Sequence, residues 1–201
     1  MYRVAKFCIV VGLAALVPAI SASSSRAGGN HVSQDGALAI HSLQDAVDWD
    51  NAIAEEKIGD LLWQGAADYP RNRTEAVRHY DNAANLGIAS AERKLAIAYA
   101  NGQGTQADDA QMLHWQRKAA EAGDAVAAGM LGYAIMIGLD GTYDMVEAAT
   151  WLTLATETST SEEWRFHAAA YARDAQSKLT QAEHEAFHAR LAYWRSTLNG
   201  E

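Results

Sequence analysis

The chain has 201 residues, which is enough for one domain of ordinary size. Its composition, 49% hydrophobic and 20% charged, suits a folded globular protein and excludes an intrinsically disordered one. The formal net charge of -9 argues against nucleic acid as a partner, because an acidic protein repels the phosphate backbone.

Residues 1–22 have the layout of a secretory signal peptide. Two basic residues precede an apolar run from Phe7 to Val17, and small and polar residues follow it. This run covers only about half of a bilayer, which disfavours a stable transmembrane helix. We expect cleavage near Ala22, with Ala27 as the alternative, and a periplasmic or secreted protein. An uncleaved N-terminal anchor is the competing interpretation.

Cleavage would change the chemistry available to the mature chain. The only cysteine, Cys8, lies in the predicted signal peptide, so the mature protein would have neither a disulfide nor a thiol nucleophile. Loss of Arg3 and Lys6 would move the formal net charge from -9 to -11, two units lower. Residues 23–37 follow, and their Ser-, Gly- and Asn-rich start predicts a flexible leader without a discernible function.

Three windows of small residues repeat along the next part of the chain. They align without gaps at offsets of 37 and 36 residues, and they begin at Ala46, Ala83 and Ala119 and end at Gly65, Gly102 and Gly138. The segments between them repeat as well, with His79, Trp115 and Trp151 at one shared position. Self-similarity at this period predicts a solenoid, which we place at residues 38–158 as two and a half to three units.

Each unit should consist of two helices. The repeated positions recur in steps of three and four, which places each set on one face of a helix. The aligned glycine should end the first helix, and the second should begin near a cap such as Asp108 or Thr74. Asp144 and Glu147 have the spacing of a capping box. Alanine and glycine at fixed positions would let the helices approach closely.

This pattern resembles the SEL-one-like repeat family, a relative of the tetratricopeptide arrays. The hallmark order of Leu-Gly, Tyr, Gly-x-Gly, Asp, Trp and Lys-Ala-Ala can be followed from Leu95 to Gly123, although Ala96 stands where the family has glycine. The third unit departs at Ile135 and Asp140. The resemblance covers residues 43–158 and implies an all-α superhelical solenoid that binds other proteins and has no catalytic role.

The C-terminal segment, residues 159–201, departs from the repeat. We expect two helices there, over residues 162–178 and 181–198, with Thr180 and Glu183 as a capping box for the second. The ends of a solenoid need atypical capping units, and this pair fits that role. Family members often end in a helix that the stretch from Leu179 to Trp194 resembles.

One motif carries a catalytic alternative. His184, Glu185 and His188 match H-E-x-x-H, in which two histidines bind zinc and the glutamate acts as a general base. A zinc hydrolase also needs a third protein ligand downstream, and among the thirteen residues after His188 only Glu201 could serve. We therefore expect no metal, no other cofactor and no catalytic site, with the zinc-dependent hydrolase as the alternative.

Aromatic residues and a methionine outside the repeat pattern are the candidates for protein binding. Trp63, Tyr133 and Met136 lie on the first helices of their units, which line the inner surface in tetratricopeptide-like arrays. Such side chains suit protein recognition, and the competing interpretation is that they fill gaps between units. The expected function is that of an adaptor, scaffold or regulator whose partner is another protein of the cell envelope.

Overall fold

The computed structural model describes residues 52–65, 70–139, 141 and 143–200, and in them the chain forms eight α-helices and no strand. The predicted signal peptide and leader, and the start of the predicted array, lie outside these residues. The helices are α3 (Ala52–Gln64), α4 (Arg73–Asn85), α5 (Ala89–Asn101), α6 (Asp109–Glu121), α7 (Ala125–Met136), α8 (Met145–Thr158), α9 (Glu162–Ser177) and α10 (Gln181–Asn199). The expected all-α repeat solenoid is confirmed.

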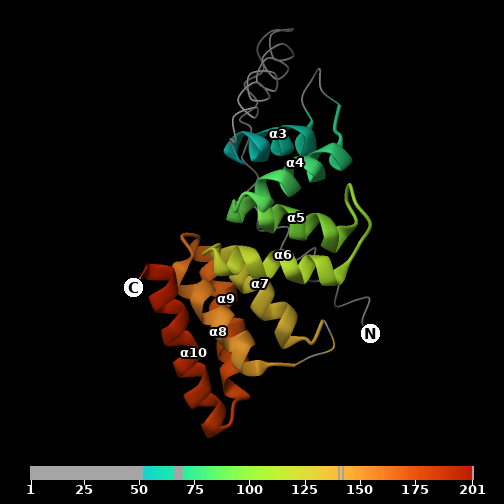
Figure 1. Ribbon diagram of the computed structural model, residues 1–201. Helices are drawn as coiled ribbons and strands as arrows, with labels where there is room; N and C mark the ends of the chain where they lie inside the picture. Colours follow the sequence, from blue (N-terminus) through green and yellow to red (C-terminus); the bar gives the residue numbers. More distant parts are fainter. Residues whose placement is uncertain (1–51, 66–69, 140, 142, 201) are drawn as a thin grey trace.

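Three helix pairs, α3–α4, α5–α6 and α7–α8, stack along one axis (Figure 1). Each second helix also packs against the first helix of the next pair, so the stack is continuous. The first helices end where the sequence predicts. Gly102, for example, ends α5 in the left-handed region with φ of 63°, and its N–H donates to the Ala98 carbonyl.

Asparagine and aspartate side chains cap the second helices. The Asp108 carboxylate accepts hydrogen bonds from the backbone N–H of Ala110 and Gln111, as expected. The prediction that Thr74 caps the helix is wrong, because Asn72 caps α4 and Thr74 lies inside its first turn. Asp144 accepts from the Glu147 N–H, while the Glu147 carboxylate forms an ion pair with Arg117 and accepts from Trp151.

Small residues are buried at equivalent positions of the helix pairs. Ala91 and Ala127, at equivalent positions of α5 and α7, are fully buried, and so are Ala83, Ala119 and Ala155 on the second helices. Larger side chains fill the space between them in two clusters, one over α3 to α6 and one over α6 to α10. The burial of the alanines fits the expectation that small residues let the helices pack closely.

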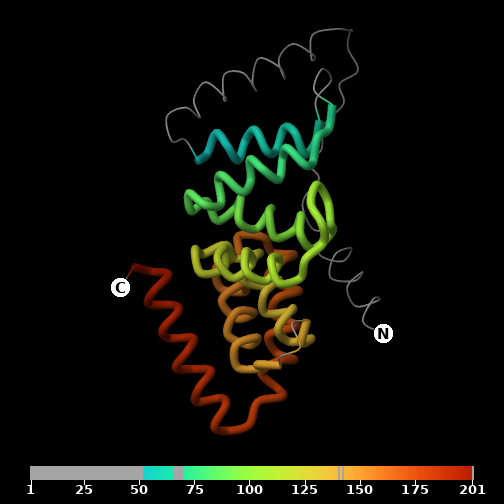
Figure 2. The backbone as a smooth tube through the Cα atoms, turned by 45° about the vertical axis from the view of Figure 1, so that its right-hand side comes forward, coloured from blue at the N-terminus to red at the C-terminus, as the bar shows by residue number. Residues whose placement is uncertain are grey.

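The last helix departs from the repeat. The capping box of Thr180 and Glu183 is present at the start of α10, as expected. The helix then packs across α8 (Figure 2), with the rings of Trp194 and Trp151 4.7 Å apart between centroids. An ion pair also links α10 to the N-cap of α8, where Arg190 Nη1 lies 3.2 Å from Asp144 Oδ2. The second helix of the third unit is thus covered.

Candidate functional site

One face of α7 distinguishes the third unit from the first two. At about 100° per residue, Val126, Met130, Tyr133 and Ile137 fall within a sector of about 60°, on the side of the helix turned away from α8. All four side chains are partly exposed, whereas Leu131 on the opposite side is fully buried. We call these four residues the α7 stripe. It gives α7 an apolar character on every face.

The equivalent positions of the earlier units are mostly polar. With offsets of 36 and 37 residues, the α7 stripe corresponds on α5 to Ser90, Lys94, Ile97 and Asn101, and on α3 to Ile53, Lys57, Asp60 and Gln64. A helix that only needed to pack against its own unit could keep this face polar, as α3 and α5 do. Two residues of the stripe, Tyr133 and Ile137, pack against the core cluster over α6 to α10, and the whole stripe is apolar where the earlier units are mostly polar.

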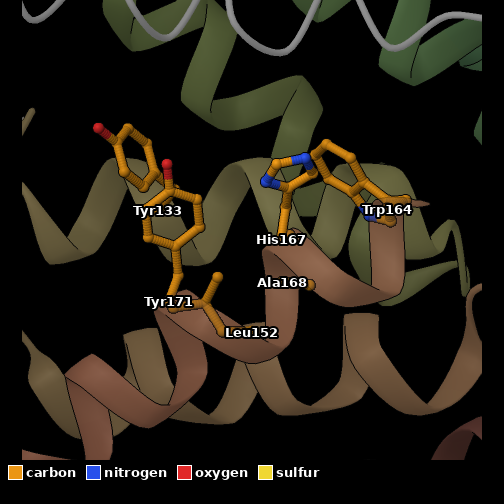
Figure 3. Close-up of a pocket in the computed structure, with 7 residues that line it drawn as sticks. Tyr133, Leu152, Trp164, His167, Ala168 and Tyr171 are labelled. Atoms are coloured by element: carbon orange, nitrogen blue, oxygen red, sulfur yellow. The ribbon is translucent and has the colours of Figure 1, made fainter. Parts of the chain in front are cut away.

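Helix α9 lies along one edge of the stripe. The rings of Tyr133 and Tyr171 are 4.7 Å apart between centroids, and with His167 they line a small hollow between α7 and α9 (Figure 3). The hollow has a volume of about 10 Å³, room for one water molecule and not for a small-molecule ligand. The hollow lies at the edge of the stripe, where Tyr133 lines it.

The position of α9 depends on a glycine of α7. Trp164 packs over Gly129 so closely that a Cβ added to the glycine would lie 2.7 Å from Cζ2 of the indole. The Trp164 Nε1–H also donates to the Ala125 carbonyl, at 3.3 Å between nitrogen and oxygen. Because only glycine leaves room for the indole, Gly129 sets the distance between α9 and the stripe.

Charged side chains connect the first two units, and Lys94 and Asp60 among them stand at positions equivalent to the α7 stripe. Lys94 of α5 bridges Glu56 and Asp60 of α3, with Nζ–O distances of 2.7 and 2.6 Å. Burial opposes ionisation of Glu56, but hydrogen bonds from Lys94 and Ser90 and the nearby positive charges outweigh it and lower its pKa. The charged groups on this side of α3 and α5 are therefore paired with each other.

A buried carboxyl group also joins the two helices within each of the first two pairs. His79 Nδ1 lies 2.5 Å from Glu55 Oε2, and both side chains are buried, so no substrate can reach this acid–base pair. The equivalent carboxyl of the second unit is Glu92, which has Lys118 3.6 Å away. Burial raises the pKa of Glu92, and the charge of Lys118 offsets this only in part. In the third unit Ala128 takes the position.

The three residues predicted for protein binding occupy different surroundings. Tyr133 belongs to the α7 stripe. Trp63 lies against its own second helix, with its ring 6.0 Å from that of Tyr80 and 5.1 Å from the Arg73 guanidinium. Met136, expected on an open surface, is 8% exposed and part of the core. The structure does not bring the three together, and sequence reasoning missed Val126, Met130 and Ile137.

The H-E-x-x-H residues lie on α10. The rings of His184 and His188 stack with centroids 6.4 Å apart, and Glu185 and His188 are exposed to solvent. Among the residues that the structure describes, no three His, Cys, Asp or Glu side chains gather as metal ligands would. None of the described helices has the length and apolar character needed to span a membrane.

The helix pairs, their glycine ends and their small-residue crossings define an all-α repeat solenoid. The Sel1 repeat family matches residues 52–88, 89–124 and 125–157, more than half of the chain. The chain belongs to the Sel1 repeat family. The three matched segments begin at the first residues of α3, α5 and α7, so the family pattern and the helix pairs divide the chain in the same way.

Two solved structures share the fold. One is c5321, a protective antigen of uropathogenic Escherichia coli strains with an SLR fold, at 23% identity and a TM-score of 0.65 over 79% of this chain. The other is a Sel1 repeat protein from Oxalobacter formigenes, at 22% identity and a TM-score of 0.61 over 84% of this chain. The chain spans 33% and 66% of their lengths. No curated protein gives a significant sequence match.

Proposed function

We propose that the chain is a non-enzymatic adaptor or scaffold that binds another protein through the α7 stripe. Sel1 repeats are generally protein–protein interaction modules, and the family therefore supports binding as the class of function. The single observation that carries the site is the change from mostly polar residues on α3 and α5 to wholly apolar residues at the equivalent positions of α7. A partner segment with apolar side chains would fit there.

The stripe has the features of an interface centre. Methionine adapts to irregular surfaces, and tyrosine offers an apolar ring with a polar end. Lys94, the α5 residue equivalent to Met130, forms ion pairs with Glu56 and Asp60 of α3, so in the second unit this position serves a contact within the array. Partly exposed apolar residues gathered on one helix face are typical of the centre of a protein interface.

We further propose that this binding takes place outside the cytoplasm, in the periplasm or beyond. The support is the three-part pattern of residues 1–22, which lie outside the described part of the chain. In that compartment the partner would be another protein of the cell envelope.

Site-specific crosslinking in cells tests the proposal. A photo-reactive amino acid at position 130 should yield a discrete crosslinked species whose partner mass spectrometry can identify. The same amino acid at position 189, an exposed alanine on the far side of α10, is the control and should yield none. Identical products from both positions, or none from position 130, would contradict a binding role for the stripe.

A further inference from the structure

Helix α9 takes the place of a fourth first helix in the array. It packs against α8 as α5 packs against α4 and α7 against α6. With an offset of 37 residues, its four buried residues fall on buried positions of α7: Trp164 on Ala127, Ala168 on Leu131, Ala172 on Ile135 and Ala175 on Gly138. The repeat geometry therefore continues through α9 beyond the last matched repeat.

One side of α9 corresponds to the side of α7 that contacts α9, and no helix among the described residues packs on it. Under the same offset Phe166 corresponds to Gly129 and Ala170 to Tyr133, the positions through which α7 contacts α9. In α9 both are exposed, Phe166 to 69%. The chain continues into α10, which packs on α8. An aromatic ring thus stands in solvent where the array normally adds its next unit.

The residues beside Phe166 form a self-complementary set. Glu163, Phe166, Ala170 and Arg173 follow one another at steps of three, four and three, which places them on one narrow seam of the helix. Neither Glu163 nor Arg173 makes an ion pair with a described residue, and Arg173 Nε donates only to the Ala169 carbonyl of its own helix. The acidic and basic ends lie symmetrically about residue 168.

We propose that two copies of the chain associate through this seam of α9, antiparallel and with two-fold symmetry. An antiparallel second helix places Glu163 opposite Arg173 of the second copy, and Phe166 opposite its small Ala170. Each contact occurs twice, as two-fold symmetry requires. A parallel arrangement would instead set like charges against each other. The proposal concerns α9 alone and does not depend on binding at the α7 stripe.

The proposed contact between the two α9 helices is small, which limits the affinity of the dimer. One pair of helices buries less than the roughly 1,200–2,000 Å² of a standard stable interface. The phenylalanine ring beside an alanine is the anchor, and the paired charges mainly fix the register. The dimer should therefore form in the micromolar range and dissociate on dilution.

Sedimentation equilibrium of the purified full chain tests the seam. The wild-type protein should dimerise with increasing concentration, and Phe166→Asp should remain monomeric. Glu163→Arg or Arg173→Glu should each raise the dimer Kd about tenfold or more, because each sets like charges opposite each other. Combining both reversals restores opposite charges across the seam and should return the Kd close to the wild-type value.

A charge reversal elsewhere provides the control. Glu121→Arg, on the exposed surface of α6, should leave the dimer unchanged, and circular dichroism should show that every variant is folded. Met130→Asp should also dimerise normally, which separates this contact from the α7 stripe. A wild-type chain that stays monomeric up to high micromolar concentrations overturns the proposal. So does a dimer that the single reversals leave intact, or one that the double reversal fails to restore.

Discussion

Lys94 of α5 reaches back to α3, where its Nζ lies 2.7 Å from Glu56 Oε1 and 2.6 Å from Asp60 Oδ1. The hydroxyl of Tyr80 on α4 donates to the same Asp60 Oδ1, at 2.9 Å, and burial raises the pKa of this tyrosine above its ordinary value. Three helices thus meet at one charged group. The first two units are joined by ionic contacts, and the third unit is joined to α9 by aromatic ones.

Two buried carboxyl groups, one on α3 and one on α5, should change the stability of the fold in opposite directions when they are neutralised. The folded state lowers the pKa of Glu56, so ionised Glu56 stabilises the fold above about pH 4.5, and this stabilisation is lost as pH falls through the folded pKa. The folded state raises the pKa of Glu92, so its ionisation costs stability at pH 7, and this cost disappears as pH falls towards 4.5.

At pH 7 Glu56→Gln should therefore destabilise the protein by about 1–3 kcal/mol, whereas Glu92→Gln should be neutral or stabilising. Urea denaturation at pH 7 and at pH 4 measures both, and the difference between each variant and the wild type should shrink at pH 4. Equal destabilisation by the two substitutions would show that the surroundings of Glu92 hold its charged form.

The packing of α9 on Gly129 predicts a coupled pair of substitutions. Gly129→Ala should destabilise the fold by about 1–3 kcal/mol, because the new methyl group meets the Trp164 ring. In a Trp164→Leu background the smaller side chain leaves room, and the penalty of the same substitution should fall. Thermal unfolding of the four proteins gives the coupling energy. Additive effects would mean that the two residues do not constrain each other.

The small-residue positions predict a further stability change. Ala127 is fully buried, and its carbonyl accepts a hydrogen bond from Gln116 Nε2 at 3.1 Å. Ala127→Leu should lower the free energy of unfolding by about 1–3 kcal/mol through overpacking. Ala186→Leu, the same change on the exposed side of α10, should have little effect. Similar melting temperatures for both variants would count against close crossing at residue 127.

The repeat period predicted the helix pairs because equivalent residues solve the same packing problem in each unit. It could not predict which side of a first helix stays open, because that depends on how neighbouring helices cross. Trp63 and Met136 are equivalent to each other, yet Trp63 packs on Tyr80 of its own second helix and Met136 is buried in the core. Tyr133, three residues before Met136, lies on the open side.

The path of α10 was also beyond sequence reasoning. The capping box of Thr180 and Glu183 predicted the start of a helix, but a local pattern does not show which surface the helix covers. The choice of α8 rests on contacts between residues far apart in the chain, among them Trp151 with Trp194 and Glu157 with Arg195. Because α10 packs on α8, Phe166 of α9 stays exposed, a feature that no local pattern indicates.

The proposed export predicts processing of the N-terminus. Intact-mass measurement of the protein recovered from the periplasm or medium should correspond to cleavage between Ser21 and Ala27, so that Cys8 is absent. The cytoplasmic fraction should contain only the precursor. Full-length protein held in the inner membrane would contradict cleavage and support an N-terminal anchor.

The most direct test of the α7 stripe compares affinity with stability for the partner that crosslinking identifies. Met130→Asp should weaken binding about thirtyfold, as expected for a lost interface anchor of about 2 kcal/mol, and leave the melting temperature nearly unchanged because the side chain lies outside the core clusters. Trp63→Ala should do the reverse, with a lower melting temperature and normal binding of the folded protein. Wild-type affinity in Met130→Asp would contradict the account.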